Sequence, residues 1–229
     1  MTLTPRRLVT STAVLGVLVA FIVQQVVVNG WLSSFDQWAA ERSRDLRASR
    51  EIFTVTVRLG LRGMLISFFI PLMAWLSWRR KTWAPLAGLI LVLLFETGMA
   101  GGLKLAIGRT FPYDHYFYEN VTVGVGEMAF PSGHAVNVIA LNGYVAWYIS
   151  RTWKRWARIT TWIVVALVAI EVGVSSWLIQ THWPTDHFAG YAIGGIALLA
   201  VVGLFNAMGL NPLATPQPWQ ANRPESPDG

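Results

Sequence analysis

The sequence HWPTDHFAGYAIGGIALLAVVGL, residues 182–204, sets a polar island directly before a long apolar run. The run from Phe188 to Leu204 carries no charged side chain, and about 20 apolar residues form a helix long enough to span a bilayer. Pro184 suits the first turn of a helix, so we expect the helix to begin there. Because polar groups at membrane depth are costly unless satisfied, His182 and Asp186 predict a functional site at its head.

Five more apolar runs predict an all-α integral membrane protein with six transmembrane helices in one bundle. These runs are Leu8–Val28, Met64–Trp78, Ala84–Leu103, Ala135–Ser150 and Ile159–Ile179. Charged residues make up 13% of the chain, whereas soluble domains carry roughly 25%. Residues 1–210 are expected to form a single membrane domain, and the proline-rich tail 211–229 is expected to be disordered.

Charge and composition exclude several classes of function. The net charge is +6, but the basic residues lie beside apolar runs, where membrane topology and anionic lipid headgroups explain them better than a nucleic acid does. The chain has no cysteine, which excludes disulfides, thiolate metal sites and a cysteine nucleophile.

The basic loops predict how the bundle is oriented. The loops at 79–81 and 151–158 fall on the same side as the N-terminus if all six helices span the membrane. The positive-inside rule makes that side cytoplasmic, so both termini are expected in the cytoplasm. The three polar islands of the chain then meet on the extracytoplasmic side.

A charged extracytoplasmic segment, residues 31–62, separates the first two apolar runs. Its acids and arginines are spaced for pairing along a helix, and Trp31, Phe35 and Trp38 fall on one helical face. A helix lying in the membrane interface fits this pattern, and a solvated linker helix fits it equally well.

The first two polar islands have groups suited to holding an anion. Lys104 and Arg109 end the third apolar run and could clamp phosphate oxygens, or could be ordinary cations that reach the membrane surface. Ser132 and Gly133 come at the start of the fourth run, where free backbone N–H groups point towards an incoming anion. His134 follows them directly.

The third island pairs His182 with Asp186 at a spacing of i,i+4. A carboxylate beside an imidazole fixes its tautomer and stabilises its charged form, as in many nucleophile assemblies. A helix-capping aspartate beside an interfacial histidine is the simpler alternative. A metal site made of His134, His182, Asp186 and His187 is a further rival, although the nearby lysine and arginine would repel a cation.

The three islands together resemble the type 2 phosphatidic acid phosphatase superfamily, the lipid phosphate phosphatases. The family signature is Lys-x6-Arg-Pro, then Pro-Ser-Gly-His, then Ser-Arg-x5-His-x3-Asp. The corresponding strings here are KLAIGRTFP (Lys104–Pro112), PSGH (Pro131–His134) and SSWLIQTHWPTD (Ser175–Asp186). The resemblance covers residues 64–204.

This resemblance implies a metal-independent mechanism without a cofactor. His182 would attack phosphorus to form a phosphohistidine, with Asp186 orienting it, and His134 would protonate the leaving oxygen and then activate water. The groups that would hold the phosphoryl oxygens are Lys104, Arg109, Ser132 and the Gly133 backbone N–H.

The chain departs from the signature at two positions. Phe111 and Ser176 stand where the family has arginines, and Arg109 matches a second arginine that is often seen in the first motif. Each lost charge-assisted contact is worth about 1.5–3 kcal/mol. At about 1.4 kcal/mol per tenfold in rate, two losses would remove roughly two to four orders of magnitude unless something compensates. The loss favours a substrate with less phosphate charge, or one with a bulkier headgroup, over a diphosphate.

Other side chains are candidates for shaping the substrate site. Tyr113 and Asp114 lie in an aromatic loop after the first motif, and Ser175 and Glu171 lie just before the third. Glu96 and Glu171 are acids within apolar runs, where an acid is usually paired or faces a cavity.

We therefore expect a membrane-embedded phosphatase that hydrolyses a polyprenyl (di)phosphate, phosphatidylglycerophosphate or a similar phospholipid of the cell envelope. Its expected location is the bacterial cytoplasmic membrane. One alternative is a phosphotransferase that passes the phosphoryl group to a lipid or sugar acceptor. Another is a catalytically degenerate lipid-binding or assembly protein on the same scaffold, which Phe111 and Ser176 would favour and the intact His134, His182 and Asp186 argue against.

Overall fold

The structure is a computed structural model that describes residues 4–46, 50–113, 123–124 and 126–209. The described residues form helices and contain no strand. In chain order the helices are α1 (Pro5–Val27), α2 (Trp31–Asp45), α3 (Arg50–Thr56), η2 (Val57–Gly60), α4 (Arg62–Arg80), α5 (Ala84–Ile107), α6 (Gly133–Asn137), η4 (Val138–Asn142), α7 (Gly143–Ser150), α8 (Arg155–Leu178) and α9 (Pro184–Ala207).

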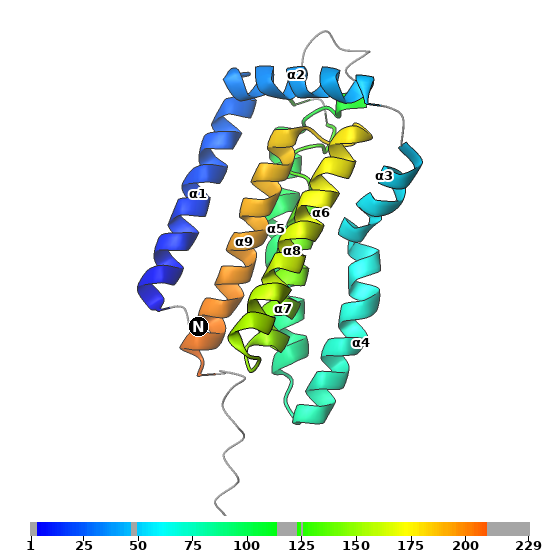
Figure 1. Ribbon diagram of the computed structural model, residues 1–229. Helices are drawn as coiled ribbons and strands as arrows, with labels where there is room; N and C mark the ends of the chain where they lie inside the picture. Colours follow the sequence, from blue (N-terminus) through cyan, green and yellow to red (C-terminus); the bar gives the residue numbers. More distant parts are fainter. Residues whose placement is uncertain (1–3, 47–49, 114–122, 125, 210–229) are drawn as a thin grey trace, which may run out of the picture.

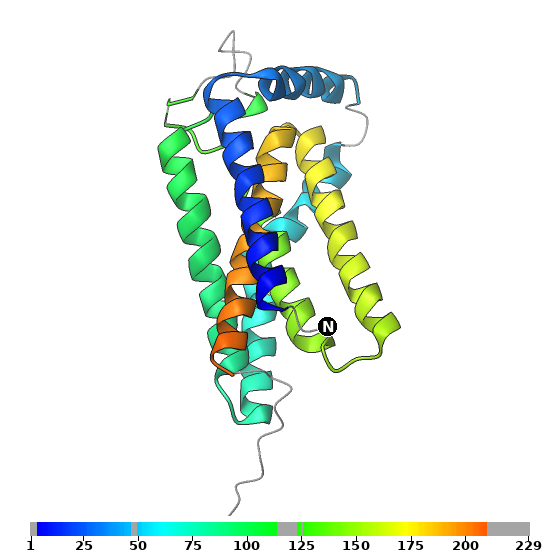
Figure 2. The same cartoon turned by 90° about the vertical axis from the view of Figure 1, so that its left-hand side faces the viewer.

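The long helices run side by side, and α2 lies across one end of the bundle (Figures 1 and 2). We call this end of the molecule the α2 end. The starts of α6 and α9 and the final turns of α5 and α8 all lie towards it (Figure 1). Helix α9 is central, because it packs against α1, α5, α6 and η4.

Four of the described helices, α1, α5, α8 and α9, are long and apolar enough to cross a membrane. The segments Glu51–Gly60 and Arg62–Arg80, bent by 45° at their junction, provide a fifth candidate if they act as one span. The expected helix over 135–150 is instead three consecutive pieces, α6, η4 and α7, of which η4 is a π-helical turn. The count of six spans stays a prediction.

The segment 31–62 is helical over most of its described length, which both readings of the sequence expected. In α2 the side chains of Trp31, Phe35 and Trp38 are exposed, while the opposite face turns towards the bundle. The tail 211–229 lies outside the described residues.

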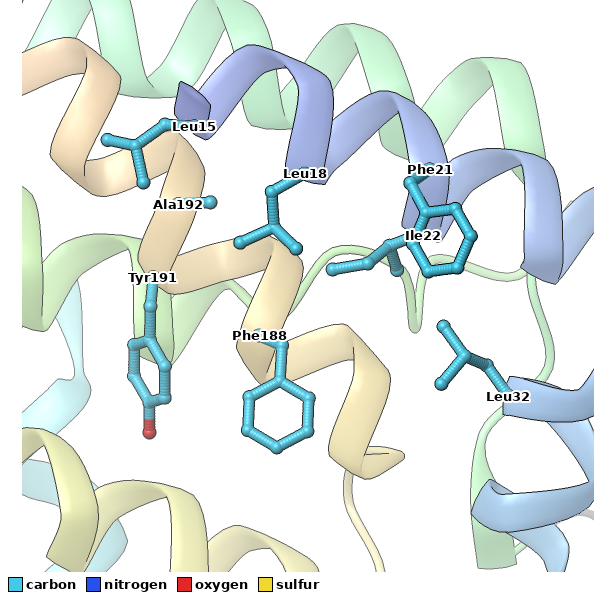
Figure 3. A pocket seen from close by; sticks show the side chains of 8 residues that line it. All are labelled: Leu15, Leu18, Phe21, Ile22, Leu32, Phe188, Tyr191 and Ala192. Atoms are coloured by element: carbon cyan, nitrogen blue, oxygen red, sulfur yellow. The ribbon is translucent and has the colours of Figure 1, made fainter. Parts of the chain in front are cut away.

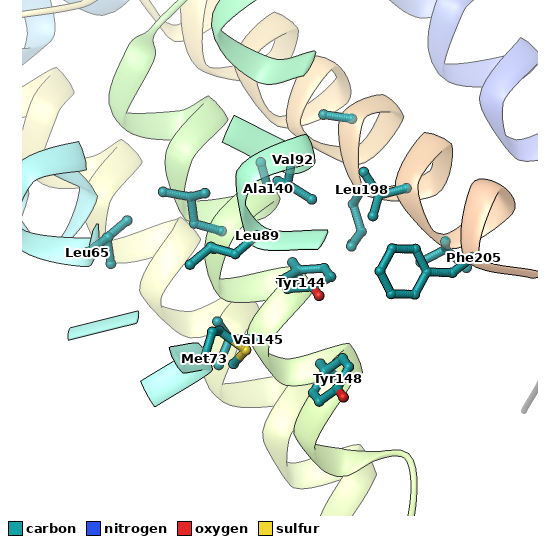
Figure 4. Packing of buried hydrophobic residues seen from close by; sticks show 14 of the residues in the cluster. Leu65, Met73, Leu89, Val92, Ala140, Tyr144, Val145, Tyr148, Leu198 and Phe205 are labelled. Atoms are coloured by element: carbon teal, nitrogen blue, oxygen red, sulfur yellow. The ribbon is translucent and has the colours of Figure 1, made fainter. Parts of the chain in front are cut away.

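The main apolar core lies between α4, α5, α7 and α9 (Figure 4). Leu89, Val92, Tyr144 and Val201 are fully buried there. The Tyr144 hydroxyl donates to the Pro85 carbonyl oxygen at 2.8 Å, so the one polar atom of that ring has a partner inside the core.

Two glycines bring α9 against the helix that starts at Gly133. A Cβ added at Gly190 would lie 2.7 Å from the Ser132 carbonyl oxygen, and one added at Gly194 would lie 2.7 Å from that of Val136. Small residues at a spacing of four allow two helix backbones to approach closely. This contact holds the second and third polar islands together.

Candidate active site

The second island forms the start of α6. The hydroxyl of Ser132 accepts a hydrogen bond from the Ala135 N–H at 3.4 Å and so caps the helix. The N–H groups of Gly133 and His134 lie in the first turn, where a helix offers no partner of its own. They are therefore available to an anion, and Ser132 can still donate its hydroxyl hydrogen.

The third island forms the start of α9, with Pro184 in its first turn. One carboxylate oxygen of Asp186 accepts a hydrogen bond from the Trp183 N–H at 3.0 Å. The same oxygen lies 3.4 Å from His182 Nδ1, within ion-pair distance but without the alignment of a hydrogen bond. The sequence-predicted pairing of His182 with Asp186 is therefore present, in a loose form that is common in ligand-free sites.

The two islands are joined by a backbone hydrogen bond. The Ser132 N–H donates to the Asp186 carbonyl oxygen at 3.0 Å, and the rings of His134 and His182 lie edge to face with centroids 6.1 Å apart. Two histidines 48 positions apart in the sequence thus face one another across a narrow gap.

Lys104, from the last turn of α5, reaches the same place. Its ammonium donates a hydrogen bond to the Met128 carbonyl oxygen, three residues before Pro131. Its charge interacts electrostatically with Asp186 and with His134. The first island thus contributes a cation beside the two histidines.

Arg109, which the sequence analysis assigned to the phosphate, lies elsewhere. Its side chain is fully buried, and its two terminal nitrogens donate to Asp186 Oδ1 at 2.6 Å and to Asp36 Oδ2 at 2.7 Å. Its guanidinium lies 5.3 Å from the centroid of the Trp183 ring. Burial would lower the pKa of Arg109, but Asp186 and Asp36 together raise it above its ordinary value. Arg109 thus supports Asp186 from behind and does not face the gap between the histidines.

Neutral groups occupy the two positions where the family signature has arginines. The ring of Phe111 lies against His182, with centroids 5.7 Å apart, and stacks on Tyr113. Ser176 is fully buried, with its hydroxyl 2.7 Å from that of Thr181.

The other candidates for shaping the substrate site have different neighbours. Ser175 is buried and its hydroxyl donates a hydrogen bond to Glu171 at 2.7 Å. Tyr113 reaches the site through its stacking on Phe111. Asp114 lies outside the described residues.

The acid in the middle of α5 is paired with a cation of α4. Glu96 is fully buried and forms an ion pair with Arg62 of α4 at 3.0 Å. Arg62 also reaches Asn137 of α6 at 3.5 Å. Arg62 thus crosslinks α4, α5 and α6.

His187 lies beside the site. Its ring is nearly fully buried, and neither ring nitrogen has a hydrogen-bond partner among the residues that the structure describes. It stands edge to face with His182 at 5.5 Å and stacks on Tyr191. Across the described chain, no group of three or more His, Cys, Asp or Glu side chains is arranged to hold a metal ion.

An apolar groove of about 450 Å³ opens between α1, the start of α2 and α9. Figure 3 shows its lining side chains, among them Phe188, Tyr191 and Ala192 of α9. These three residues of α9 follow Asp186 in the same helix. A surface of this composition suits hydrocarbon chains of the membrane.

The sequence analysis missed Asp36, a fully buried residue of α2 that forms an ion pair with Arg109. The sequence analysis counted this acid among the acids and arginines that could pair along a helix, whereas its side chain is fully buried against Arg109. A signal was present in the sequence: Ser33, Asp36, Ala40 and Ser43 fall on one helical face, and three of the four are small. An acid among small residues on a face that packs against neighbours has to be paired.

The chain is similar to several known proteins. The sequence model of the PAP2 superfamily matches residues 85–209. Phosphatidylglycerophosphatase B of Bacillus subtilis (strain 168) is 25% identical over 158 residues, covering 67% of this chain and 73% of that protein. An Escherichia coli (strain K12) protein provisionally named as the undecaprenyl-diphosphatase YbjG is 26% identical over 156 residues, covering 66% of this chain and 73% of that protein.

The fold has a solved counterpart as well. The crystal structure of a transmembrane PAP2-type phosphatidylglycerolphosphate phosphatase from Bacillus subtilis aligns with a TM-score of 0.74 and 21% identity, covering 86% of this chain and 97% of that one. Apolar helices of spanning length and a transmembrane neighbour identify an integral membrane protein. With its family model matched over more than half of its length, the chain belongs to the PAP2 superfamily.

Proposed function

We propose that this protein is a lipid phosphate phosphatase that acts through a phosphohistidine on His182. The observation that carries the proposal is the convergence of His182 and Asp186 with His134 and Lys104, which come from three separate parts of the chain. The substrate would be a polyprenyl phosphate or diphosphate, phosphatidylglycerophosphate or a similar phospholipid. Relatives named as phosphatases for two of these lipid classes support that range.

The chemistry follows from the orientation of the His182 ring. Because Nδ1 faces Asp186, the proton belongs on Nδ1 and the lone pair of Nε2 is free to attack. Attack on the terminal phosphorus forms the Nε2–P bond and breaks the bond from that phosphorus to the leaving oxygen. His134 gives that oxygen a proton, so a lipid alcohol leaves from a monoester and a lipid monophosphate leaves from a diphosphate.

The second half of the cycle uses the same groups in reverse. His134, now neutral, takes a proton from water, and the resulting hydroxide attacks the phosphorus of the phosphohistidine. The Nε2–P bond breaks, inorganic phosphate leaves and His182 is restored. Lys104 and the Gly133 N–H would hold the non-reacting oxygens in both steps.

Phe111 and Ser176 bear on which lipid is used. Each replaces a guanidinium of the family signature by a neutral group beside the site. A diphosphate carries more charge than a monoester and would lose more from this change. The pair therefore favours a phosphate monoester over a diphosphate.

The membrane orientation proposed from the basic loops places the α2 end outside the cytoplasm. Phosphate would then be released on the extracytoplasmic side, where the headgroup meets water while the lipid chains stay in the bilayer. Addition of a membrane-impermeant thiol reagent to cells carrying a cysteine at exposed Glu41 tests this arrangement, and lack of labelling in intact cells would refute it.

The function is tested by phosphate release from purified protein with a chelator present. The panel contains dioctanoyl phosphatidic acid, phosphatidylglycerophosphate and polyprenyl mono- and diphosphates, with His182→Ala as the control variant. We expect release that survives chelation, is greatest for a monoester and disappears in the variant. A strong preference for diphosphate would contradict the substrate assignment.

The same panel separates the alternatives. Glycerol added as an acceptor would yield glycerol phosphate in place of inorganic phosphate if the protein were a phosphotransferase. A folded protein that binds the lipids and releases phosphate from none of them would be a degenerate lipid-binding member of the family.

A further inference from the structure

We propose that Asp36 of α2 is a positioning residue of the active site, which holds Arg109 against Asp186 and thereby fixes the carboxylate that orients His182. The inference rests on the proposed function of His182 and Asp186. Asp36 belongs to none of the three islands and lies outside residues 85–209, which the family model matches.

A continuous chain of contacts leads from Asp36 to the nucleophile. Asp36 Oδ2 accepts a hydrogen bond from Arg109 Nη2 at 2.7 Å, and Arg109 Nη1 donates to Asp186 Oδ1 at 2.6 Å. The other oxygen of Asp186 faces His182 Nδ1. Each carboxylate oxygen of Asp186 therefore has its own task, one towards the arginine and one towards the histidine.

Asp36 also holds the start of α9 directly. Its Oδ1 accepts a hydrogen bond from the Thr185 N–H at 3.0 Å, and its Oδ2 accepts one from the Thr185 hydroxyl. The Thr185 hydroxyl is also an acceptor for Arg109 at 2.9 Å. A carboxylate near the N-terminus of a helix satisfies free N–H groups and opposes the positive end of the dipole. Asp36 thus fixes the residue next to Asp186 as well as the arginine behind it.

Burial explains why this arrangement is geometrically strict. The side chains of Asp36, Arg109 and Asp186 are all fully buried. A buried charge that loses its partner costs several kcal/mol of stability. Arg109 must therefore stay close to both carboxylates, which leaves the three side chains few alternative positions. A change at Asp36 therefore reaches Asp186 through Arg109.

Helix α2 has other attachments, which makes the test feasible. Trp177 Nε1 of α8 donates to the Ala39 carbonyl oxygen at 2.8 Å. Gln180 donates to the Ala40 carbonyl oxygen at 3.1 Å and to Ser43 at 3.3 Å. Removing the charge of Asp36 is therefore expected to leave α2 in place.

The charges around Asp36 predict a pH signature. Burial raises the pKa of Asp36 to about 6, although Arg109 lowers it, and Asp186 acts in the same direction as burial. The side chains that hydrogen-bond the neighbouring Ala39 and Ala40 carbonyl oxygens, Trp177 of α8 and Gln180 just after it, are uncharged. Asp36 is thus ionised above about pH 6 and neutral below it, where it comes to resemble asparagine.

The test compares Asp36→Asn with Glu41→Gln, which removes an exposed acid of the same helix. Both full-length variants are assayed in detergent micelles with dioctanoyl phosphatidic acid between pH 5 and 7.5. For Asp36→Asn we expect kcat to fall about 10- to 100-fold at pH 7.5, with KM changed less than about threefold because Asp36 does not touch substrate. The ratio of wild-type to variant kcat should shrink towards one as the pH falls to 5, and Glu41→Gln should match the wild type throughout.

A purely structural role gives a different result. Loss of folded protein would lower every rate by the same factor, so a ratio that does not change with pH would overturn the proposal. Equal behaviour of the two variants would overturn it too.

A second measurement does not depend on turnover. The ¹H and ¹⁵N resonances of the His182 Nδ1–H group, assigned with His182→Ala, should shift in Asp36→Asn and stay unchanged in Glu41→Gln. Activity that survives in His182→Ala would refute the proposed function, whereas unshifted His182 resonances in Asp36→Asn would refute the positioning role.

Discussion

The contact between α9 and the start of α6 makes Gly190→Ala a sharp test of the site geometry. The new Cβ would lie 2.7 Å from the Ser132 carbonyl oxygen, whereas ordinary contacts begin at 3.4 Å, so the neighbours must separate by about 0.7 Å. Because the obstacle is backbone, the Ser132–His134 segment moves relative to Asp186. Misplacement of reacting groups by about 1 Å can cost 100-fold in rate, so we expect kcat to fall about 10- to 100-fold, together with about 1–3 kcal/mol of stability from overpacking.

The matched control is Gly203→Ala in the same helix. Its new Cβ would meet only Leu8 Cδ1 at 3.9 Å, an ordinary contact, and replacing a helical glycine by alanine gains about 0.5–1 kcal/mol. The assays are kcat with dioctanoyl phosphatidic acid and thermal unfolding followed by tryptophan fluorescence. If Gly190→Ala keeps activity within about threefold of Gly203→Ala, the close approach of α6 and α9 does not position the histidines.

Three further substitutions test separate parts of the structure. His187→Leu removes a buried imidazole whose nitrogens have no hydrogen-bond partner in the described structure. It should therefore raise the free energy of unfolding by about 1 kcal/mol or more, and a loss of stability in chemical denaturation would contradict this interpretation. Phe111→Arg restores a signature cation beside His182. It should increase kcat/KM for a polyprenyl diphosphate about tenfold relative to kcat/KM for the monophosphate. If this ratio of kcat/KM values does not change, the side chain at position 111 does not contact the second phosphate. Arg62→Leu leaves Glu96 buried without its ion-pair partner and should lower the free energy of unfolding by about 1–3 kcal/mol. Adding Glu96→Leu should recover most of this loss. If the losses of the two single variants add in the double variant, the ion pair does not contribute to stability.

Much of the site could be predicted from local sequence. The apolar runs indicated the helices because length and composition are local properties of the sequence. The polar islands at the ends of those runs indicated where the site lies and that it contains the two histidines and Asp186. The helix boundaries were less predictable: α4 begins at Arg62 after a bend, and the run 135–150 contains a π-helical turn. Both features depend on how neighbouring helices pack.

The partners of the charged residues could not be predicted in the same way. Arg109 has the charge and the sequence position of a phosphate ligand. Only the packing of α2 and α9 around it shows that it pairs with two buried carboxylates, Asp36 and Asp186. Glu96 could be recognised as an acid that needs a partner, but its pairing with Arg62 depends on the packing of α4 against α5. Contacts between distant segments are properties of the folded state.

The most direct test of the central claim is to trap the phosphoryl group on His182. The substrate is 4-nitrophenyl [³²P]phosphate, whose leaving group needs no proton, and the protein is His134→Ala, which should form the phosphohistidine but hydrolyse it slowly. We predict a base-stable, acid-labile label that accumulates towards one per chain and is absent from the His134→Ala, His182→Ala double variant. A label that persists in the double variant, or no label in a protein whose wild type hydrolyses the same ester, would contradict the claim.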